Sequence, residues 1–167
     1  MPTELRAATA EDTRAIGAAI APLLRAGDAL ALTGELGAGK TTFAQGVAKG
    51  LGYAGPVVSP TFTLVREYRT DRLTLVHADV YRLDRVQDVV DLALHEFLDD
   101  DGVLLVEWGD AVEALLPTDH LVVELTVPGD GPGDREERRI AVSAVGEGWV
   151  LRRETLEHAL EPWGATA

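Results

Sequence analysis

The stretch "GELGAGKTTF", residues 34–43, has the spacing G-x-x-x-x-G-K-[ST] of a loop that binds phosphate groups. Such a loop binds phosphate because its glycine-rich backbone bends and directs amide N–H groups at the start of a helix toward the anion. The flanking residues suit this arrangement. "ALALT" at 29–33 has the composition of a short buried strand, and apolar residues recur at four-residue spacing over 43–51, before Gly52. The sequence therefore predicts a strand, a phosphate-binding loop and a helix in succession, rather than a glycine-rich turn without a ligand.

The length of 167 residues and a hydrophobic content of 46%, enough to fill one sizeable core, predict a single domain over residues 1–167. The phosphate-binding motif makes this a predicted P-loop domain. The formal net charge of −13 argues against tight nonspecific nucleic-acid binding, which depends on clustered Lys and Arg. We therefore expect any polynucleotide to be held by a partner. The chain has no cysteine, which excludes disulfides, thiolate metal sites and a cysteine nucleophile. It shows neither a signal-peptide-like start nor an apolar run of about 18 residues, so a cytoplasmic protein without a membrane span is expected.

Strand-like and helical stretches alternate after the loop. This alternation predicts an α/β fold, a three-layer sandwich like that of P-loop NTPases, with a mostly parallel central sheet. Two further strand-like runs joined by a glycine- and proline-rich loop predict an antiparallel hairpin at the sheet edge. The predicted strands cover about 29–33, 63–68, 73–79, 103–108, 121–127 and 138–145, and the predicted helices begin near 9–12, follow the loop, and cover about 86–97 and 153–160.

Two carboxylates come at the ends of strand-like runs. Glu107 follows four aliphatic residues, and Asp79 ends the run at 73–79. Because the carboxyl ends of parallel strands meet at the crevice where ligands bind, both acids are expected near the phosphate-binding loop. A magnesium–nucleotide site needs a hydroxyl and usually such a carboxylate, so Glu107 is a candidate metal ligand and Asp79 a candidate for positioning metal or water. The alternatives are an ordinary strand-end acid and a helix cap.

Three further parts of the sequence bear on this site. The segment "SPTFT", residues 59–63, precedes a strand where a loop could reach a terminal phosphate, and Thr61 is its candidate hydroxyl. A rigid proline turn is the alternative. Arg82 could supply a cation to the phosphate, although a surface ion pair is the expectation. His77 lies in the middle of a strand, where we expect a core histidine with satisfied hydrogen bonds and no proton-transfer role.

Several stretches together resemble one protein family. "GELGAGKTTFAQG", "VVSPTFTLVREY", "HADVYRL" and "VEWGD", in this order, are similar to the bacterial TsaE family over nearly the whole chain. The phosphate-binding loop alone is generic, whereas "SPTFTL" and "HxDxYRL" followed by "EW" are specific. The resemblance implies an Mg²⁺-dependent ATPase subunit of the machinery that makes threonylcarbamoyladenosine beside the anticodon of tRNA. It also implies a TsaB–TsaD partner complex that binds the tRNA and performs the transfer.

The resemblance further implies roles for individual residues. Lys40 would bind the β and γ phosphates of ATP, and Thr41 and Glu107 would hold Mg²⁺. Asp79 would be needed for hydrolysis, and residues 59–63, with Thr61, would form a switch-like loop. The residues predicted to act in catalysis are Asp79, Glu107 and Thr61.

The remaining nucleotide contacts come from the loop and from one arginine. Arg135, in "GDREERR", is similar to a family arginine near the nucleotide base, and Thr13 is expected close by. The chain has Glu35 where many relatives carry Asp, and Ala93 where a glycine is common. The predicted nucleotide-binding residues are Gly37, Ala38, Gly39, Lys40, Thr41, Thr42 and Arg135.

Three other functions compete with this interpretation. A regulatory GTPase would resemble its relatives in an Asn-Lys-x-Asp motif, but the chain contains no asparagine. A small-molecule P-loop kinase usually carries an arginine-rich lid, and only scattered arginines follow the loop helix. A noncatalytic nucleotide-dependent assembly module is also consistent with the sequence, because the family that it resembles consists of partner-dependent ATPases whose hydrolysis can serve mainly to reset a complex. Phosphate release with and without partner proteins separates that module from an ATPase.

Overall fold

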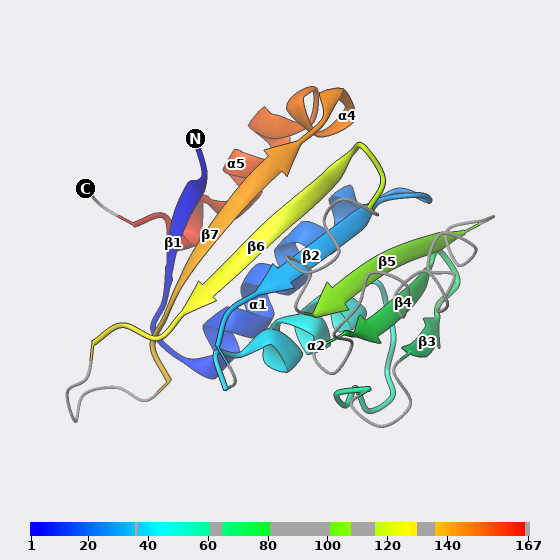
Figure 1. Cartoon of the computed structure of the whole chain (residues 1–167), viewed down its shortest axis with the longest axis horizontal. Helices are drawn as coiled ribbons and strands as arrows, with labels where there is room; N and C mark the ends of the chain where they lie inside the picture. Colours follow the sequence, from blue (N-terminus) through cyan, green and yellow to red (C-terminus); the bar gives the residue numbers. More distant parts are fainter. Residues whose placement is uncertain (36, 61–64, 81–100, 108–115, 130–135, 166–167) are drawn as a thin grey trace.

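The computed structural model of the chain describes residues 1–35, 37–60, 65–80, 101–107, 116–129 and 136–165. Within them, one seven-stranded sheet has the order β1-β7-β6-β2-β5-β4-β3 (Figure 1). Its strands are β1 (Thr3–Ala7), β2 (Ala29–Thr33), β3 (Val65–Arg69), β4 (Thr74–Asp79), β5 (Gly102–Glu107), β6 (His120–Thr126) and β7 (Arg138–Val145). The helices are α1 (Ala10–Ile20), α2 (Lys40–Gly50), α4 (Glu147–Val150) and α5 (Arg153–Leu160), with 3-10 turns η1 (Ala21–Leu23) and η4 (Glu161–Trp163).

The centre of the sheet is parallel and both of its edges are antiparallel. Strands β6, β2, β5 and β4 run in the same direction, β3 completes one edge, and β7 and β1 complete the other. Every residue of β5 and four of the five residues of β2 are buried, as in parallel strands that are covered on both faces. The predicted α/β fold with an antiparallel β6–β7 hairpin is confirmed, whereas β1 and the antiparallel pairing of β3 were not predicted.

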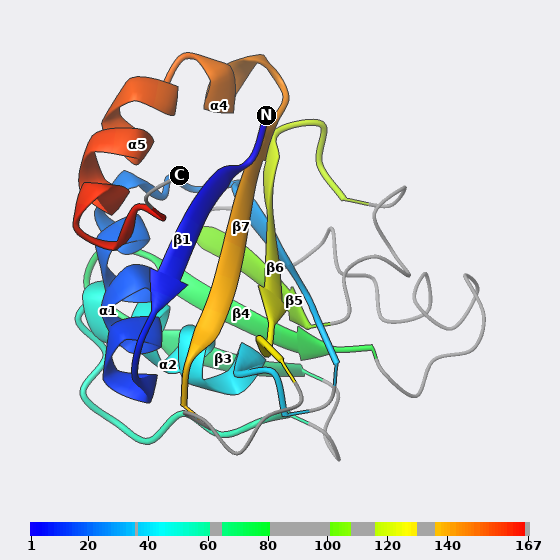
Figure 2. The same ribbon diagram turned by 90° about the vertical axis from the view of Figure 1, so that its left-hand side faces the viewer.

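Helices α1 and α2 cover one face of the sheet, and α5 lies on the same side (Figure 2). The two long helices cross closely at glycines. A Cβ atom at Gly17 would lie 2.5 Å from the carbonyl oxygen of Phe43, and one at Gly46 would collide with that of Arg14. This close crossing brings the start of α1 next to the start of α2. The core side chains between these helices and the sheet include Ile16, Ile20, Leu30, Leu32, Phe43, Val47 and Leu105.

The helix ends follow from local chemistry. The Thr9 hydroxyl accepts a hydrogen bond from the Asp12 amide at 3.1 Å, and the Asp12 carboxylate accepts one from the Thr9 amide at 3.2 Å, which completes a capping box for α1. Helix α2 ends just before Gly52, which has a φ of +98°, as the sequence predicts. The predicted helix at 86–97 lies outside the described residues. No described helix is long and apolar enough to cross a membrane.

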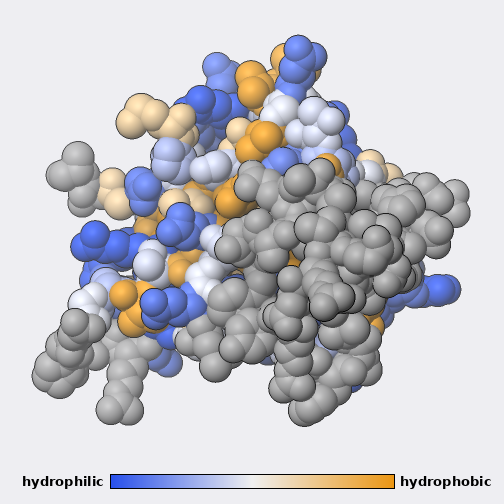
Figure 3. Space-filling view, viewed as in Figure 1, coloured by the Kyte–Doolittle hydropathy of each residue, from blue (hydrophilic) through white to orange (hydrophobic). Residues whose placement is uncertain are grey.

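The surface of the described part mixes polar and apolar residues. Figure 3 shows hydrophilic and hydrophobic residues interspersed over one face of the molecule. The large hydrophobic residues that are most exposed in the described part come from four places along the chain: Met1, Val58, Val127, and the adjacent pair Val150 and Leu151. Scattered exposed side chains of this kind are normal in folded proteins.

Candidate functional site

The phosphate-binding loop joins the end of β2 to the start of α2 and bends at glycines. Gly34 has a φ of +141° and Gly39, the residue before α2, a φ of +103°. A Cβ atom at Gly34 would also lie 2.5 Å from the Leu125 carbonyl oxygen on β6. Both the backbone conformation and the packing against β6 therefore require glycine at this position. The first amide groups of α2 face the loop without partners in their own helix, which favours an anion there.

Lys40 begins α2 and turns back onto the loop. Its ammonium group donates hydrogen bonds to the carbonyl oxygens of Gly34, at 2.7 Å, and Glu35, at 3.0 Å. The residue is buried, with 5% of its surface exposed. A positive charge is thus held against the loop backbone, where the sequence predicts phosphate binding.

Thr41, Glu107 and Asp79 come together from three elements. The Thr41 hydroxyl, in the first turn of α2, lies 3.4 Å from Glu107 Oε1 at the end of β5. Asp79 is the register partner of Glu107 in the parallel β4–β5 pair, and both acids are buried. The two strand-end carboxylates therefore lie side by side, as predicted, and Glu107 reaches the first turn of α2.

His77 adds a contact that the sequence did not predict. Its Nε2 atom lies 2.6 Å from Glu107 Oε2, and the two side chains are 0% and 4% exposed. The expected core placement of His77 is confirmed, but its hydrogen bonding is not complete, since Nδ1 has no hydrogen-bond partner in the described part of the chain. The spacing of His77 and Asp79, two residues apart on a strand, could have indicated that these two side chains share a face, but only the β4–β5 register brings that face to Glu107.

Ser59 connects the segment before β3 to the same carboxylates. Its hydroxyl donates to Asp79 Oδ2 at 3.3 Å. The start of the predicted switch loop, residues 59–63, therefore contacts the acid proposed for hydrolysis. Thr61 lies outside the described residues, as do Arg82 and Arg135.

The residues just before Ser59 are held from two sides. Gln45 of α2 donates its amide to the Val57 carbonyl at 3.1 Å, and the Tyr68 hydroxyl of β3 donates to the Val58 carbonyl at 3.2 Å. Burial raises the pKa of the Tyr68 phenol, which keeps this donor protonated. Helix α2 and strand β3 therefore fix the path of the chain into the segment at 59–63.

Arg138, at the start of β7, is the described arginine of this hairpin that touches the loop. Its guanidinium donates to the carbonyl oxygens of Ala38, at 2.8 Å, and Gly37, at 3.2 Å. Thr13 of α1 also lies beside the loop: it is buried, and its methyl group would be 3.9 Å from a Cβ atom at Gly39. The sequence alone does not single out Arg138, because several arginines occur within a few residues of one another. Only the register of β7 determines which of them contacts the loop.

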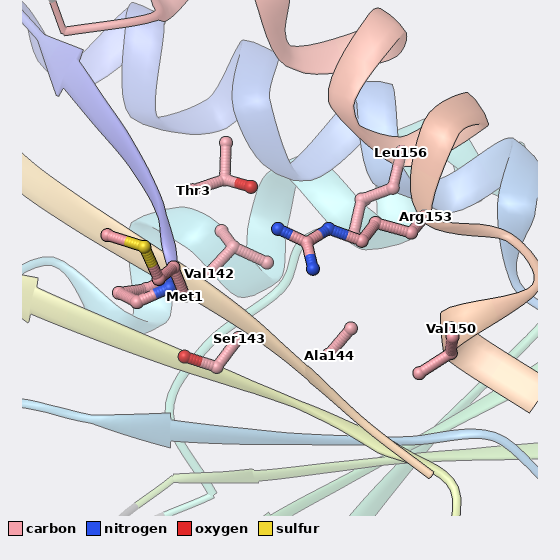
Figure 4. A pocket seen from close by; sticks show the side chains of 9 residues that line it. Met1, Thr3, Val142, Ser143, Ala144, Val150, Arg153 and Leu156 are labelled. Atoms are coloured by element: carbon pink, nitrogen blue, oxygen red, sulfur yellow. The ribbon is translucent and has the colours of Figure 1, made fainter. Parts of the chain in front are cut away.

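A surface hollow lies away from this loop, beside the far end of β7. Figure 4 shows its lining from the N-terminal segment, β7 and the C-terminal helices. Its labelled residues include Met1, Val142, Ala144, Val150 and Leu156. None of the predicted site residues that the structure describes lines this hollow, whereas Lys40, Thr41, Asp79 and Glu107 gather at the loop edge of the sheet, which is the candidate site.

Comparisons with known proteins relate the chain to one family. A family model described as "Threonylcarbamoyl adenosine biosynthesis protein TsaE" matches residues 7–138, which include the loop, both carboxylates and the start of β7. Proteins described as "tRNA threonylcarbamoyladenosine biosynthesis protein TsaE" are 42% identical in Bacillus subtilis, over 90% of this chain and 91% of the relative, and 42% identical in Treponema pallidum, over 74% and 90%. The crystal structure of Bacillus subtilis YdiB aligns with a TM-score of 0.77 and 38% identity, over 95% of this chain and 97% of that one.

Replacing Arg138 tests its hold on the loop. Arg138→Ala removes the donors to two loop carbonyls, so hydrogen exchange of the amides at 37–39 in the free protein should accelerate about fivefold, equivalent to about 1 kcal/mol. Arg139→Ala, which removes the exposed neighbouring arginine, should leave that exchange unchanged. Equal exchange rates in the parent and in Arg138→Ala would show that the loop keeps its shape without this contact.

Proposed function

The chain belongs to the TsaE family of threonylcarbamoyladenosine biosynthesis proteins, and from this premise we propose that it is an Mg²⁺-dependent ATPase serving that modification of tRNA, next to the anticodon. The observation that carries the ATPase proposal is the approach of Thr41 Oγ1 to Glu107 Oε1, at 3.4 Å, beside the phosphate-binding loop. A hydroxyl and a strand-end carboxylate at this place are the protein ligands that nucleotide-bound magnesium uses in P-loop enzymes.

The residues present fit magnesium. Mg²⁺ prefers oxygen ligands, keeps several waters, and usually binds through one or two carboxylates together with substrate phosphates. Thr41 and Glu107 would be its protein ligands, and the ion would neutralise charge on the β and γ phosphates. Among the described residues, no group of three or more His, Cys, Asp or Glu side chains could hold a metal ion by itself, so the proposed Mg²⁺ would need the nucleotide phosphates and water as further ligands.

ATP would lie along the loop and the start of α2. The ammonium of Lys40 would leave its loop carbonyls to bind the β and γ phosphates, and the amides from Gly37 to Thr42 would surround them. Thr13 and Arg138 lie beside Gly37, Ala38 and Gly39, which supports a nucleotide path between α1 and the β6–β7 hairpin. Arg135 comes three residues before Arg138 in the sequence, and we keep it as a proposed ligand near the nucleotide base.

Hydrolysis would depend on Asp79 and the segment at 59–63. Asp79 lies beside Glu107 and accepts a hydrogen bond from Ser59, so it can orient a water near the terminal phosphate while it contacts the proposed switch loop. Thr61 would sense the γ-phosphate. Lys40 would already be engaged with the β and γ phosphates, and Arg138 is bound to loop carbonyls, so an additional transition-state cation would come from elsewhere.

The proposed source of that activation is a TsaB–TsaD complex that itself holds the tRNA. A chain with a net charge of −13 is poorly suited to bind tRNA through phosphate contacts, so the contact with tRNA would be indirect. Since tRNA is the object of the modification, we place the activity in the cytoplasm. The alternative, a noncatalytic nucleotide-dependent assembly module, would use the same loop without hydrolysis.

The two carboxylates are expected to act at different steps. Glu107→Ala should weaken Mg²⁺-dependent ATP binding by at least about tenfold, or about 1.4 kcal/mol, because a metal ligand is lost. Asp79→Ala should leave ATP binding nearly intact and slow hydrolysis by about 100-fold, because water is no longer oriented. Calorimetry and single-turnover phosphate release measure the two steps.

The exposed strand residue Glu124 provides the matched control, and Glu124→Ala should change neither step. If Glu107→Ala and Asp79→Ala both bind and hydrolyse ATP at parent levels, the proposed site is wrong. A reversed pattern would exchange the two roles.

The isolated protein should be a slow ATPase that its partners activate. P-loop enzymes without a supplied arginine hydrolyse at roughly 10⁻⁴ to 10⁻³ per second, and an arginine in trans adds about 10³- to 10⁵-fold. Adding the TsaB–TsaD pair should therefore raise steady-state phosphate release at least about tenfold. Thr61→Ala should blunt this rise, whereas Thr126→Ala, a change of an exposed threonine on β6, should not.

Two other outcomes of the partner experiment would favour other functions. Rapid hydrolysis by the isolated chain that ignores the partner pair would contradict the proposal and favour a small-molecule kinase, which supplied acceptors would reveal. Tight ATP binding without hydrolysis in either state would favour the assembly module.

A further inference from the structure

We propose that His77 is a positioning residue that holds one oxygen of the Glu107 carboxylate, so that Glu107 offers the metal a single oxygen. This inference rests on the proposed function, since it concerns the orientation of a proposed Mg²⁺ ligand. It assigns His77 no contact with metal or nucleotide. It predicts an effect on metal selectivity that a purely structural residue would not have.

The contacts divide the two oxygens of Glu107 between two elements. Oε2 lies 2.6 Å from His77 Nε2, and Oε1 lies 3.4 Å from the Thr41 hydroxyl. A carboxylate oxygen only accepts, so the hydrogen of this bond belongs to Nε2. The rotamer of Glu107 is therefore fixed with Oε1 toward α2 and the loop, and Oε2 toward β4.

Strand pairing places His77 within hydrogen-bonding distance of the Glu107 carboxylate. In the parallel register, His77 faces Leu105 and Asp79 faces Glu107. Because side chains alternate along a strand, these four residues lie on one face, with the imidazole one pair behind the two carboxylates. The Tyr68 ring lies near the imidazole, with ring centroids 6.2 Å apart, and the Tyr53 ring lies 4.9 Å from that of Tyr68.

A packing role alone does not explain a histidine at this position. The side chain is fully buried among apolar residues of the α1–α2 face, yet Nδ1 has no hydrogen-bond partner in the described part of the chain. A buried polar atom without a partner is unfavourable, and leucine would fill similar space without that cost. What histidine adds here is the Nε2 donor to Glu107.

The consequence concerns which metal the site accepts. With one lone pair of Oε2 engaged by His77, the contact favours monodentate coordination through Oε1, which suits the compact octahedral shell of Mg²⁺. Ca²⁺ is larger and accepts bidentate carboxylates in a flexible shell. Loss of the Nε2 donor frees Oε2, so it should weaken Mg²⁺ binding and favour Ca²⁺ in relative terms.

The test compares ATP binding by calorimetry in Mg²⁺, in Ca²⁺ and in chelator. His77→Leu should weaken Mg²⁺-dependent ATP binding about tenfold, raise the ratio of Ca²⁺ to Mg²⁺ affinity about fivefold, and leave metal-free ATP binding unchanged within about twofold. His77→Gln, whose amide can donate from near the position of Nε2, should restore most of the Mg²⁺ preference. His120→Leu, a change of another buried histidine at the opposite end of the sheet, should alter none of these values.

Several results would overturn the proposal. These are an unchanged metal preference in folded His77→Leu, or an equal loss of ATP binding with and without metal, which would indicate a general packing role. If His77→Leu does not fold, the role of His77 is tested by the His77→Gln titration and by nuclear magnetic resonance of the ¹⁵N-labelled parent. The metal-free parent should show a slowly exchanging Nε2–H proton of His77 that shifts in Glu107→Gln, and a folded parent with the hydrogen on Nδ1 would contradict the proposal.

Glu107→Ala in the same titrations separates this inference from the proposed function. If Glu107→Ala binds Mg²⁺-ATP like the parent, the proposed metal site fails, and the role of His77 fails with it. If Glu107→Ala loses Mg²⁺ dependence while His77→Leu and His77→Gln keep the parent's selectivity, only the role of His77 is wrong.

Discussion

Because β2, β5 and β4 pair in parallel, these three buried strands end together beside the N-terminus of α2, and the candidate site depends on that alignment. It places Glu107 next to Asp79 and within reach of Thr41, and it sets His77 behind them. A slip of one residue between β4 and β5 would turn His77 and Asp79 to the opposite face of the sheet, away from Glu107. The pairing of the buried apolar strands therefore also fixes the positions of the polar groups at the edge of the sheet.

The phosphate-binding loop is held from outside as well as by its own glycines. Gly34 packs against the β6 backbone, Arg138 of β7 donates to two loop carbonyls, and Thr13 of α1 lies beside Gly39. The antiparallel hairpin is thus part of the site. It also concentrates positive charge: in a chain with a net charge of −13, Lys40 and Arg138 both bond to the loop backbone, which favours an anionic ligand at this one place.

Much of the site could be predicted because its residues are fixed by local spacing. The motif determines β2, the loop and α2, and apolar runs that end in an acid locate Asp79 and Glu107. The sequence could not show which of the arginines near the start of β7 touches the loop, or that β4 lies next to β5. The second fact is what joins His77 to Glu107, 30 residues away. Strand β1 was missed because a five-residue edge strand with two of its residues buried carries a weak pattern. Predictions for Thr61, Arg135 and the helix at 86–97 stay predictions.

The central claim is that this loop binds Mg²⁺-ATP, and calorimetry of the chain with its two lysines replaced in turn tests it most directly. Lys40 and Lys49 are the only lysines and lie on the same helix, but Lys40 contacts the loop whereas Lys49 is exposed in the last turn of α2. The account predicts that the parent and Lys49→Ala bind one ATP per chain with equal affinity, and that Lys40→Ala weakens binding by at least about 100-fold, or about 2.7 kcal/mol. Equal affinity of folded Lys40→Ala and the parent for Mg²⁺-ATP would contradict it.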